Sequence, residues 1–272
     1  MTEEIYDSAN RPHPVVEEIK ALITYRDFVI QSISRSIKTR YKRSLLGVLW
    51  TILNPILTMI VLTIVFSQIF RFEVEKYPVY ILCGLVIWNF FSSSTRGAMS
   101  EMLWSGDLLS RIYVPKSIFS VTSIGNGLFN LILSLIPLYI IAIFLGVQIK
   151  FSLLITPISI LIITAFAFGI GLLLSTISVF FADMLPIYDV LITIWFYATP
   201  IIYPINIVPE QLVWVIKLNP MYYMVEIFRQ PLLNGTIPDL SYWLISITWA
   251  LLTLVIGGYL FTSKSNEYAY RI

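Results

Sequence analysis

Residue patterns that carry enzyme chemistry are missing from this sequence. The chain has one histidine, His13, and one cysteine, Cys83, so it offers no cysteine zinc site and no internal disulfide. We interpret His13, which lies in a proline-flanked polar segment, as a tail residue rather than a ligand. The phosphate-binding pattern G-x-x-x-x-G-K-[ST] and the zinc pattern H-E-x-x-H are both absent. We therefore expect no catalytic residue, no metal site and no resident cofactor in this chain.

The composition instead predicts a chain that lies in a membrane. Of its 272 residues, 57% are hydrophobic and 12% are charged, whereas soluble domains carry about 25% charged residues. A helix needs about 20 apolar residues to cross the hydrocarbon core, so uncharged windows of that length predict spans. Because backbone groups in lipid must be bonded internally, the predicted fold class is an all-α integral membrane protein. The six windows are 44–70, 77–95, 117–149, 151–182, 190–209 and 240–263.

Lysines and arginines are unevenly distributed around these windows. Thirteen of the eighteen lie before the first window, between the second and third, or after the sixth. Cytoplasmic loops carry an excess of these residues, so both termini are predicted to be cytoplasmic. The polar first forty residues lack a signal-peptide pattern, and we expect the N-terminus to be retained. The predicted organisation is a tail at 1–23, an interface helix at 24–43, a membrane domain at 44–263 and a tail at 264–272.

The windows contain essentially no ionisable side chains. A transporter driven by protons or sodium normally keeps a carboxylate or another charged group near the centre of the membrane. If this chain moves a solute, we therefore expect the energy to come from another subunit. Two segments at the predicted cytoplasmic face are candidates for receiving it.

The first candidate, 24–43, has the pattern of an amphipathic helix. Its apolar residues share one stripe, and its cations, among them Arg35, lie opposite. A helix lying on anionic lipid headgroups would explain this pattern by itself. Phe28, however, lies on the polar face, where it could mark a contact with a cytoplasmic partner. Both interpretations stay open.

The second candidate, 96–116, is too apolar for a bare loop. A short amphipathic helix in this segment could dock in a groove of another protein. The alternative is packing against the chain's own helices. The residues concerned, which lead into a predicted turn, are Met99, Met102, Leu103, Trp104 and Asp107.

The region 203–239, predicted to be external, mixes apolar residues with prolines that end or kink helices. We expect short helices that enter the outer leaflet and return, which is tolerated only against protein or a wet cavity. The alternative is an ordinary loop resting on the bilayer. Aromatic residues here and at span ends could line a channel or gate its exit, although interface or core positions also explain them. They are Trp88, Phe91, Trp195, Tyr197, Tyr203, Tyr222 and Tyr223.

Five motifs occur in order along the chain: SLLGVLWTILNP (44–55), VFSQIF (65–70), YPVYILCGLVIWNFFS (77–92), LLSRIYVPKSI (108–118) and VPEQLVWVIKLNPMYYMVEIFRQ (208–230). Together they resemble the membrane subunits of polysaccharide ABC exporters, the type-2 exporter family of O-antigen, capsule and teichoic-acid permeases. The resemblance covers most of the chain from residue 28 onward. At FFADM (180–184), Ala182 stands where the family often has an arginine, so any role of that arginine is in doubt here.

The resemblance implies six spans, an N-terminal interface helix and re-entrant external helices. It implies a homodimer bound to two copies of a separate ATPase, which would hold ATP and Mg. It also implies export of an undecaprenyl-diphosphate-linked polysaccharide across the bacterial cytoplasmic membrane. Arg40, Lys42 and Arg43 are then candidate ligands of the lipid diphosphate, because cations form charge-assisted hydrogen bonds with phosphate. The excess of positive charge at the cytoplasmic face explains them equally.

Two other functions stay open at the level of sequence. An ABC exporter of a lipid or drug would share the ATPase but need no continuous polymer channel. An ATP-independent lipid flippase or membrane transferase would need no ATPase at all. Three results would separate these functions. Stimulation of ATP hydrolysis by lipid-linked glycan would favour the polysaccharide exporter, and stimulation only by small hydrophobic compounds would favour the lipid or drug exporter. Activity without nucleotide would favour the flippase or transferase.

Overall fold

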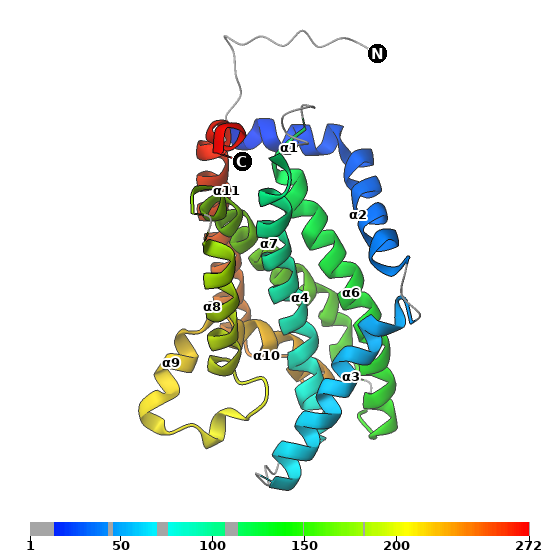
Figure 1. Ribbon diagram of the computed structural model, residues 1–272. Helices are drawn as coiled ribbons and strands as arrows, with labels where there is room; N and C mark the ends of the chain where they lie inside the picture. The colour runs from blue at the N-terminus through cyan, green and yellow to red at the C-terminus, as the bar shows by residue number, and fades with distance from the viewer. Residues whose placement is uncertain are drawn as a thin grey trace.

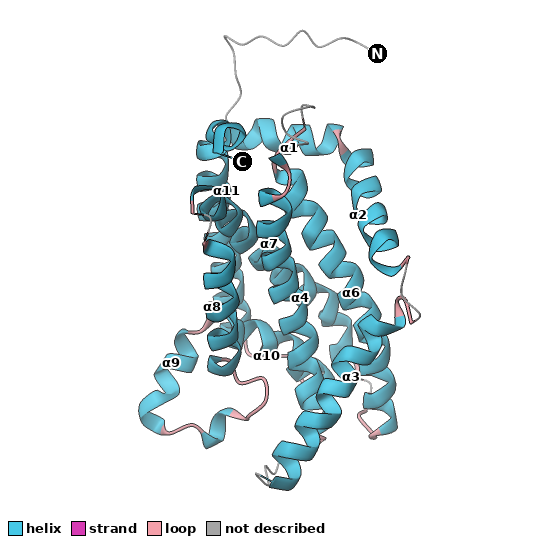
Figure 2. Ribbon diagram, viewed as in Figure 1, coloured by secondary structure: helices cyan, strands magenta, loops and turns pink. Residues whose placement is uncertain are grey.

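The computed structural model describes residues 14–42, 46–69, 76–106, 114–148, 150–181 and 183–271, which form helices joined by turns and short loops (Figure 2). No strand occurs within these ranges. In chain order the elements are α1 (Pro14–Thr24), α2 (Arg26–Tyr41), α3 (Leu49–Thr63), the π-helix η1 (Ile64–Ile69), α4 (Tyr77–Leu103), α6 (Ser117–Phe144), η2 (Phe151–Ile155), α7 (Thr156–Phe180), α8 (Met184–Ala198), η3 (Ile205–Ile207), η4 (Glu210–Leu212), α9 (Val213–Leu218), α10 (Pro220–Leu233) and α11 (Leu240–Arg271).

Five helical stretches within the described residues are long and apolar enough to cross a membrane, which confirms the all-α integral membrane fold. Figure 1 shows α4, α6, α7 and α11 running along a common direction, with α3 beside α4 and α6. The five stretches are Leu49–Phe66, Tyr77–Leu103, Ser117–Phe144, Phe151–Phe180 and Leu240–Ser265.

The predicted fifth span, 190–209, differs from the structure. The helix in this region, α8, covers Met184–Ala198 and has 15 residues. At about 1.5 Å per residue it is about 22 Å long, short of a hydrocarbon core of about 30 Å. The backbone becomes extended at Thr199, and Pro200 follows. A residue before proline disfavours the helical conformation, so the apolar run does not continue as one helix. A sixth crossing stays a prediction.

A tight bend lies between the third and fourth windows. α6 ends at Phe144, and Gly146 adopts a φ of +73°. The amide of Gly146 donates to the carbonyl of Ile143 (3.0 Å), and that of Val147 donates to the carbonyl of Ala142 (2.9 Å). These are the paired bonds of a Schellman motif. Glycine tolerates the positive φ, so it ends α6 and lets the chain turn toward α7.

α4 lies at the centre of the core. From Val79 to Phe91 every residue of α4 is buried except Asn89. Close backbone approach holds the neighbouring pair α7 and α11 together, because a Cβ added at Gly169 would lie 2.4 Å from the carbonyl carbon of Thr253. Small residues at helix crossings allow such contacts in membranes. The result is a tight core from which one polar side chain of α4 points outward.

One end of the bundle collects the N-terminal helices, the end of α4 and the end of α11 (Figure 1). Glu18 of α1 accepts hydrogen bonds from the backbone amide (2.9 Å) and the hydroxyl (2.7 Å) of Ser117, where α6 begins. Lys116 donates to the carbonyl of Ser265 on α11. Burial lowers the pKa of the Lys116 ammonium, and the carboxylate of Glu18 opposes that shift. These segments lie together, as one membrane side requires; their cytoplasmic location stays a prediction.

The N-terminal segment contains two helices where one was predicted. α1 lies largely within the predicted tail 1–23, and α2 begins at Arg26 after a break at Tyr25. The hydroxyl of Thr24 donates back to the carbonyl of Lys20 (3.0 Å) and so belongs to the end of α1. Pro14 begins α1, a position that suits proline because the first helical residue needs no amide donor. The proline was the available start signal for this helix.

Short helices are present in the region 203–239, as predicted, and α10 is packed against α4, α7 and α11. Arg229 of α10, counted from sequence as an external loop residue, is 2% exposed. Its Nη1 donates to Glu226 Oε1 (2.8 Å) and to the carbonyl of Pro200 (3.1 Å). Its guanidinium carbon lies 3.8 Å from the centre of the Tyr80 ring. The partners of Arg229 allow α10 to be buried; entry of α10 into the outer leaflet stays a prediction.

Candidate functional site

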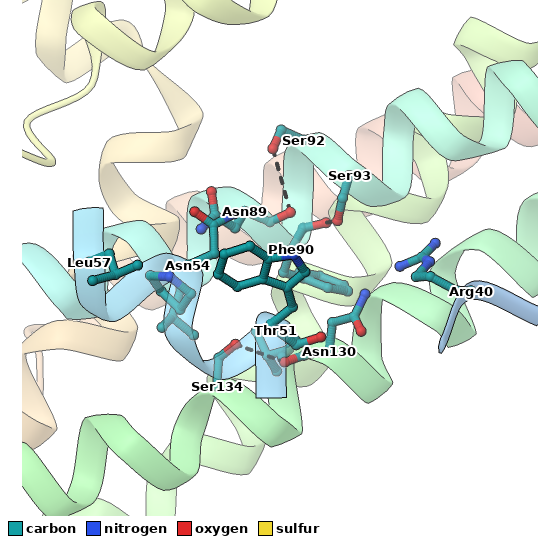
Figure 3. A pocket seen from close by; sticks show the side chains of 14 residues that line it. Arg40, Thr51, Asn54, Leu57, Asn89, Phe90, Ser92, Ser93, Asn130 and Ser134 are labelled. Carbon is teal, nitrogen blue, oxygen red and sulfur yellow. Dashed lines mark hydrogen bonds between the residues drawn. The ribbon is translucent and has the colours of Figure 1, made fainter. Parts of the chain in front are cut away.

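A polar recess opens on the side of the bundle between α2, α3, α4 and α6. Its volume is about 960 Å³. Figure 3 shows Thr51 and Asn54 of α3, Asn89 of α4 and Asn130 of α6 around this space. The described residues that line it are Arg40, Trp50, Thr51, Asn54, Pro55, Leu57, Val86, Asn89, Phe90, Ser92, Ser93, Asn130, Leu131 and Ser134.

The recess lies at mid-length of α4 and α6, and it is bordered by the end of α2 and the first turns of α3. Asn89 is near the centre of α4, which covers Tyr77–Leu103. Asn130 is near the centre of α6, which covers Ser117–Phe144. The middle of a membrane-spanning helix is the depth at which an outward side chain would otherwise meet hydrocarbon. We therefore expect the side chains of Asn89 and Asn130 to lie away from both membrane surfaces.

Two of the amides are exposed and unpaired. The side chains of Asn54 and Asn89 face outward, and neither amide has a hydrogen-bond partner among the described residues. Placing an unpaired amide in an apolar medium costs about 2–7 kcal/mol, depending on the reference solvent. Lipid chains offer no donor or acceptor, so these amides require water, a substrate or another protein surface.

The hydroxyl groups of the recess are arranged as acceptors. Ser92, Ser93 and Ser134 each donate to a carbonyl of their own helix, at 3.4, 3.3 and 2.9 Å. A hydroxyl that donates in this way keeps lone pairs for an incoming donor. Together with the amides, which both donate and accept, the lining can exchange hydrogen bonds with a polyhydroxyl molecule.

Helical spacing explains why these residues share one wall. Asn89, Ser92 and Ser93 stand at i, i+3 and i+4, which places them on one face of α4. Asn130 and Ser134, four residues apart, do the same on α6. None of them was predicted as a site residue, because all five side chains are neutral and the prediction rested on charge. Neutral polar residues recurring at helical spacing near mid-window were the available signal.

The three cations predicted to bind a lipid diphosphate do not share one pocket. Arg40 lines the recess, and Figure 3 shows it at one edge of that space. Lys42 lines a separate depression of about 710 Å³ on α2, together with Arg35 and Lys38. Arg43 lies outside the described residues. Of the described members of this set, Arg40 alone borders the recess, and phosphate binding stays a prediction.

The residues predicted to dock an ATPase from the segment 96–116 occupy two kinds of position. α4 continues as a helix to Leu103, which is half-buried. Met99 and Met102 are fully buried in the chain's own core, so they present no surface to a partner. That position matches the alternative of packing against the chain's own helices. Trp104 follows the end of α4 and is 84% exposed; Asp107 lies outside the described residues.

The docking residues predicted on the N-terminal helix lie on α2. Phe28 is half-buried and Arg35 is exposed. The opposite side of α2 packs on α6, where Asn126 donates to the hydroxyl of Ser36 (2.9 Å) and the Ile33 side chain covers Gly125. This contact leaves Arg35 on the outer side of α2, and its contact with an ATPase stays a prediction.

Several aromatic residues predicted for the channel pack between α4 and α8 instead. Trp195 of α8 meets Phe91 edge-on, with 5.3 Å between the ring centres, and lies 6.3 Å from Trp88. Trp88 and Phe91 are both buried. Trp195 Nε1 also donates to the side-chain oxygen of Asn219 (2.8 Å), which caps α10. These rings position α8 and α10 rather than line the recess.

The remaining aromatic residues support the short helices of the region 203–239. Tyr222 and Tyr223 are buried beside Tyr242, and the hydroxyls of Tyr222 and Tyr242 are 3.1 Å apart. Tyr203 donates to the carbonyl of Tyr197 (2.9 Å). Tyr197 itself is 64% exposed and is the one residue of this set with a largely free surface.

Comparison with known proteins covers nearly the whole chain. The O-antigen export system permease protein RfbA of Myxococcus xanthus is 28% identical over 260 residues, which cover 95% of this chain and 100% of that protein. A protein of the same name from Klebsiella pneumoniae is 27% identical, covering 89% and 94%. The polysialic acid transport protein KpsM of Escherichia coli is 27% identical, covering 85% and 91%. Residues 28–233 match the ABC-2 type transporter family, and the chain belongs to that family.

Proposed function

We propose that this protein is the membrane permease subunit of an ABC exporter that moves a polysaccharide across the bacterial cytoplasmic membrane. Family membership and similarity to O-antigen export permeases over almost the full length support this role. Two copies form the path of the polymer, and two copies of a separate ATPase, which binds ATP and Mg, supply the energy. The polymer arrives linked to a lipid diphosphate.

The observation that carries the proposal is the polar recess at mid-length of α4 and α6. Asn54 and Asn89 expose unpaired amides at a depth where lipid cannot satisfy them. A second copy placed against this side encloses the recess and keeps it hydrated. A polysaccharide can then replace water on the amides and hydroxyls, while the indole of Trp50, which is 53% exposed, offers a flat apolar surface to a sugar ring.

The contacts at the end of the bundle that holds α1 and the end of α11 supply a route by which the ATPase can act on this recess. Glu18 joins α1 to the start of α6 through Ser117, and α6 carries Asn130 and Ser134 in the recess wall. A displacement of α1 and α2 by the ATPase therefore reaches one wall directly. The exposed ring of Trp104 is the best-placed described residue of the segment 96–116 for contact with that partner.

Reconstitution tests the proposal. The permease and its ATPase are assembled in lipid nanodiscs, and ATP hydrolysis is measured with and without undecaprenyl-diphosphate-linked glycan. We expect the glycan to stimulate hydrolysis, and the double variant Asn54→Leu/Asn89→Leu to lose most of the stimulation while still binding the ATPase. Asn206→Leu, at an exposed asparagine outside the recess, is the matched control and should retain it.

Other results would point to other functions. Stimulation by small hydrophobic compounds only would favour a lipid or drug exporter, and transport without nucleotide would favour a flippase. Full glycan stimulation in the double variant would mean that the polymer does not pass through the recess.

A further inference from the structure

We infer that the recess selects an uncharged polysaccharide and excludes one with a carboxylate on every sugar. The inference rests on the proposed function and narrows the class of its substrate. It concerns a property that family membership leaves open, because the relatives include both O-antigen permeases and a polysialic acid transport protein.

The lining of the recess is almost free of charge. Of the fourteen residues that line it, Arg40 alone is ionised at neutral pH, and the polar remainder are amides, hydroxyls and one indole. Amides and hydroxyls match the hydroxyl groups of a neutral sugar, since both sides donate and accept hydrogen bonds. The unpaired amides of Asn54 and Asn89 are available for this exchange.

A carboxylate meets different conditions in the same place. An anion that leaves water needs a cation or several donors, and without them the effective penalty is several kcal/mol per ion. Arg40 belongs to α2, and Figure 3 shows it at one edge of the recess, where Asn130 is the labelled amide nearest to it in that view. It can pair with one anion at that edge of the recess, such as a diphosphate at the end of the polymer. Among the described residues of the lining, a carboxylate on each successive sugar finds no such partner.

Cysteine protection can measure this selectivity, because the chain has a single cysteine, Cys83, which is buried. In a Cys83→Ala background, Asn89→Cys places a thiol in the recess. The full chain is reconstituted with its ATPase, and the rate of modification by methyl methanethiosulfonate is measured. The probes are a methyl-esterified oligogalacturonate, which is neutral, and the same oligomer with free carboxylates. We expect the ester to slow modification about tenfold and the acid to change it by less than about twofold, a difference equivalent to about 1 kcal/mol or more.

Three further variants keep the test decisive. Leu251→Cys, on the exposed side of α11, should react at the same rate with either oligomer and reports any general effect of the sugars. Asn54→Cys repeats the measurement if Asn89→Cys does not assemble. Asn89→Lys combined with Asn54→Cys adds a cation beside the reporter, and the acid should then protect it.

The outcomes separate the two proposals. Equal protection by ester and acid would overturn the selectivity while leaving the export function in place, as would protection by the acid alone. If neither oligomer protects the thiol while lipid-linked glycan still stimulates ATP hydrolysis, the selectivity is wrong because the recess is not the path. Loss of glycan stimulation in the unmodified complex would instead refute the proposed function itself.

Discussion

The substitution Arg229→Met should lower thermal stability strongly, because it breaks a buried ion pair. The side chain of Arg229 is 2% exposed, and its Nη1 lies 2.8 Å from Oε1 of Glu226. Removing one member of a buried pair costs about 3–5 kcal/mol, since the other charge loses its partner. In the variant, Glu226 keeps a hydrogen bond from Gln230 (3.0 Å), so we expect a cost near the lower end of this range. The bond to the carbonyl of Pro200 adds about 1 kcal/mol, so we expect a loss of about 4 kcal/mol.

Thermal unfolding of the nanodisc-embedded protein, followed by intrinsic fluorescence, measures the effect. A change of 1 kcal/mol shifts the melting temperature of a domain approaching this size by roughly 2–4 °C, so a shift on the order of 10 °C is expected. Lys264→Met is the matched control, because the pair Lys264–Glu267 has the same i, i+3 spacing and a similar length (2.9 Å) but side chains that are 49% and 39% exposed. Exposed pairs contribute about 0–1 kcal/mol.

Comparison of single and double variants gives the sharpest check. Arg229→Met/Glu226→Leu should recover part of the loss, because no unpaired charge remains beside α10. A melting temperature of Arg229→Met within the range of Lys264→Met would refute the assignment of Arg229 as a buried anchor of α10. Independent, additive losses in the double variant would show that the two side chains do not depend on each other.

Four other changes test separate parts of the structure. Gly169→Ala should lose about 1–3 kcal/mol of unfolding free energy, because its Cβ would lie 2.4 Å from the backbone of α11, whereas Gly258→Ala, with no neighbour within 4 Å, should be unchanged or slightly stabilised. Trp104→Ala should weaken copurification with the ATPase without affecting membrane insertion; unchanged binding would remove Trp104 from the interface. Arg40→Gln should reduce glycan-stimulated hydrolysis and leave assembly intact, and full stimulation would leave this arginine only a topological role. A hydrogen bond from Lys264 holds the pKa of Glu267 below its ordinary value, so the stability that the Glu267 carboxylate contributes is present at neutral pH and is lost as the pH falls through that lowered pKa. Hydrogen exchange at the end of α11 should therefore accelerate on acidification. A flat pH profile of the exchange rate would contradict this.

Spans of ordinary length could be predicted from the sequence because lipid imposes a simple condition. A window without charge that is long enough to cross must be a helix with its backbone bonded internally. Five windows contain such a helix. The window 190–209 fails because proline chemistry acts locally and overrides average hydropathy: the helix ends at Ala198, just before the prolines.

The site could not be predicted in the same way, because it depends on which side chains the fold leaves outside. Asn89 is the one exposed residue in a stretch of α4 that is otherwise buried from Val79 to Phe91, and the sequence does not show that difference. Arg229 presents the opposite case, since its burial requires Glu226 and Tyr80 from two helices. Met99 and Met102 have the composition of a docking surface, yet they are buried because α7, α8 and α11 cover them.

The short helix α8 has a consequence for the surrounding membrane. Its outward residues Ile187, Val190, Leu191 and Ile194 are apolar, and its length of about 22 Å falls about 8 Å short of an average hydrocarbon core. If α8 is the sixth crossing, lipids that contact it must compress to match it, at a cost of fractions of a kcal/mol per Å of mismatch. A bilayer thinned at one place around a permease presents a lower barrier there to any charged headgroup. The short helix would thus thin the bilayer locally, and we expect a lipid-linked substrate to cross most easily beside it.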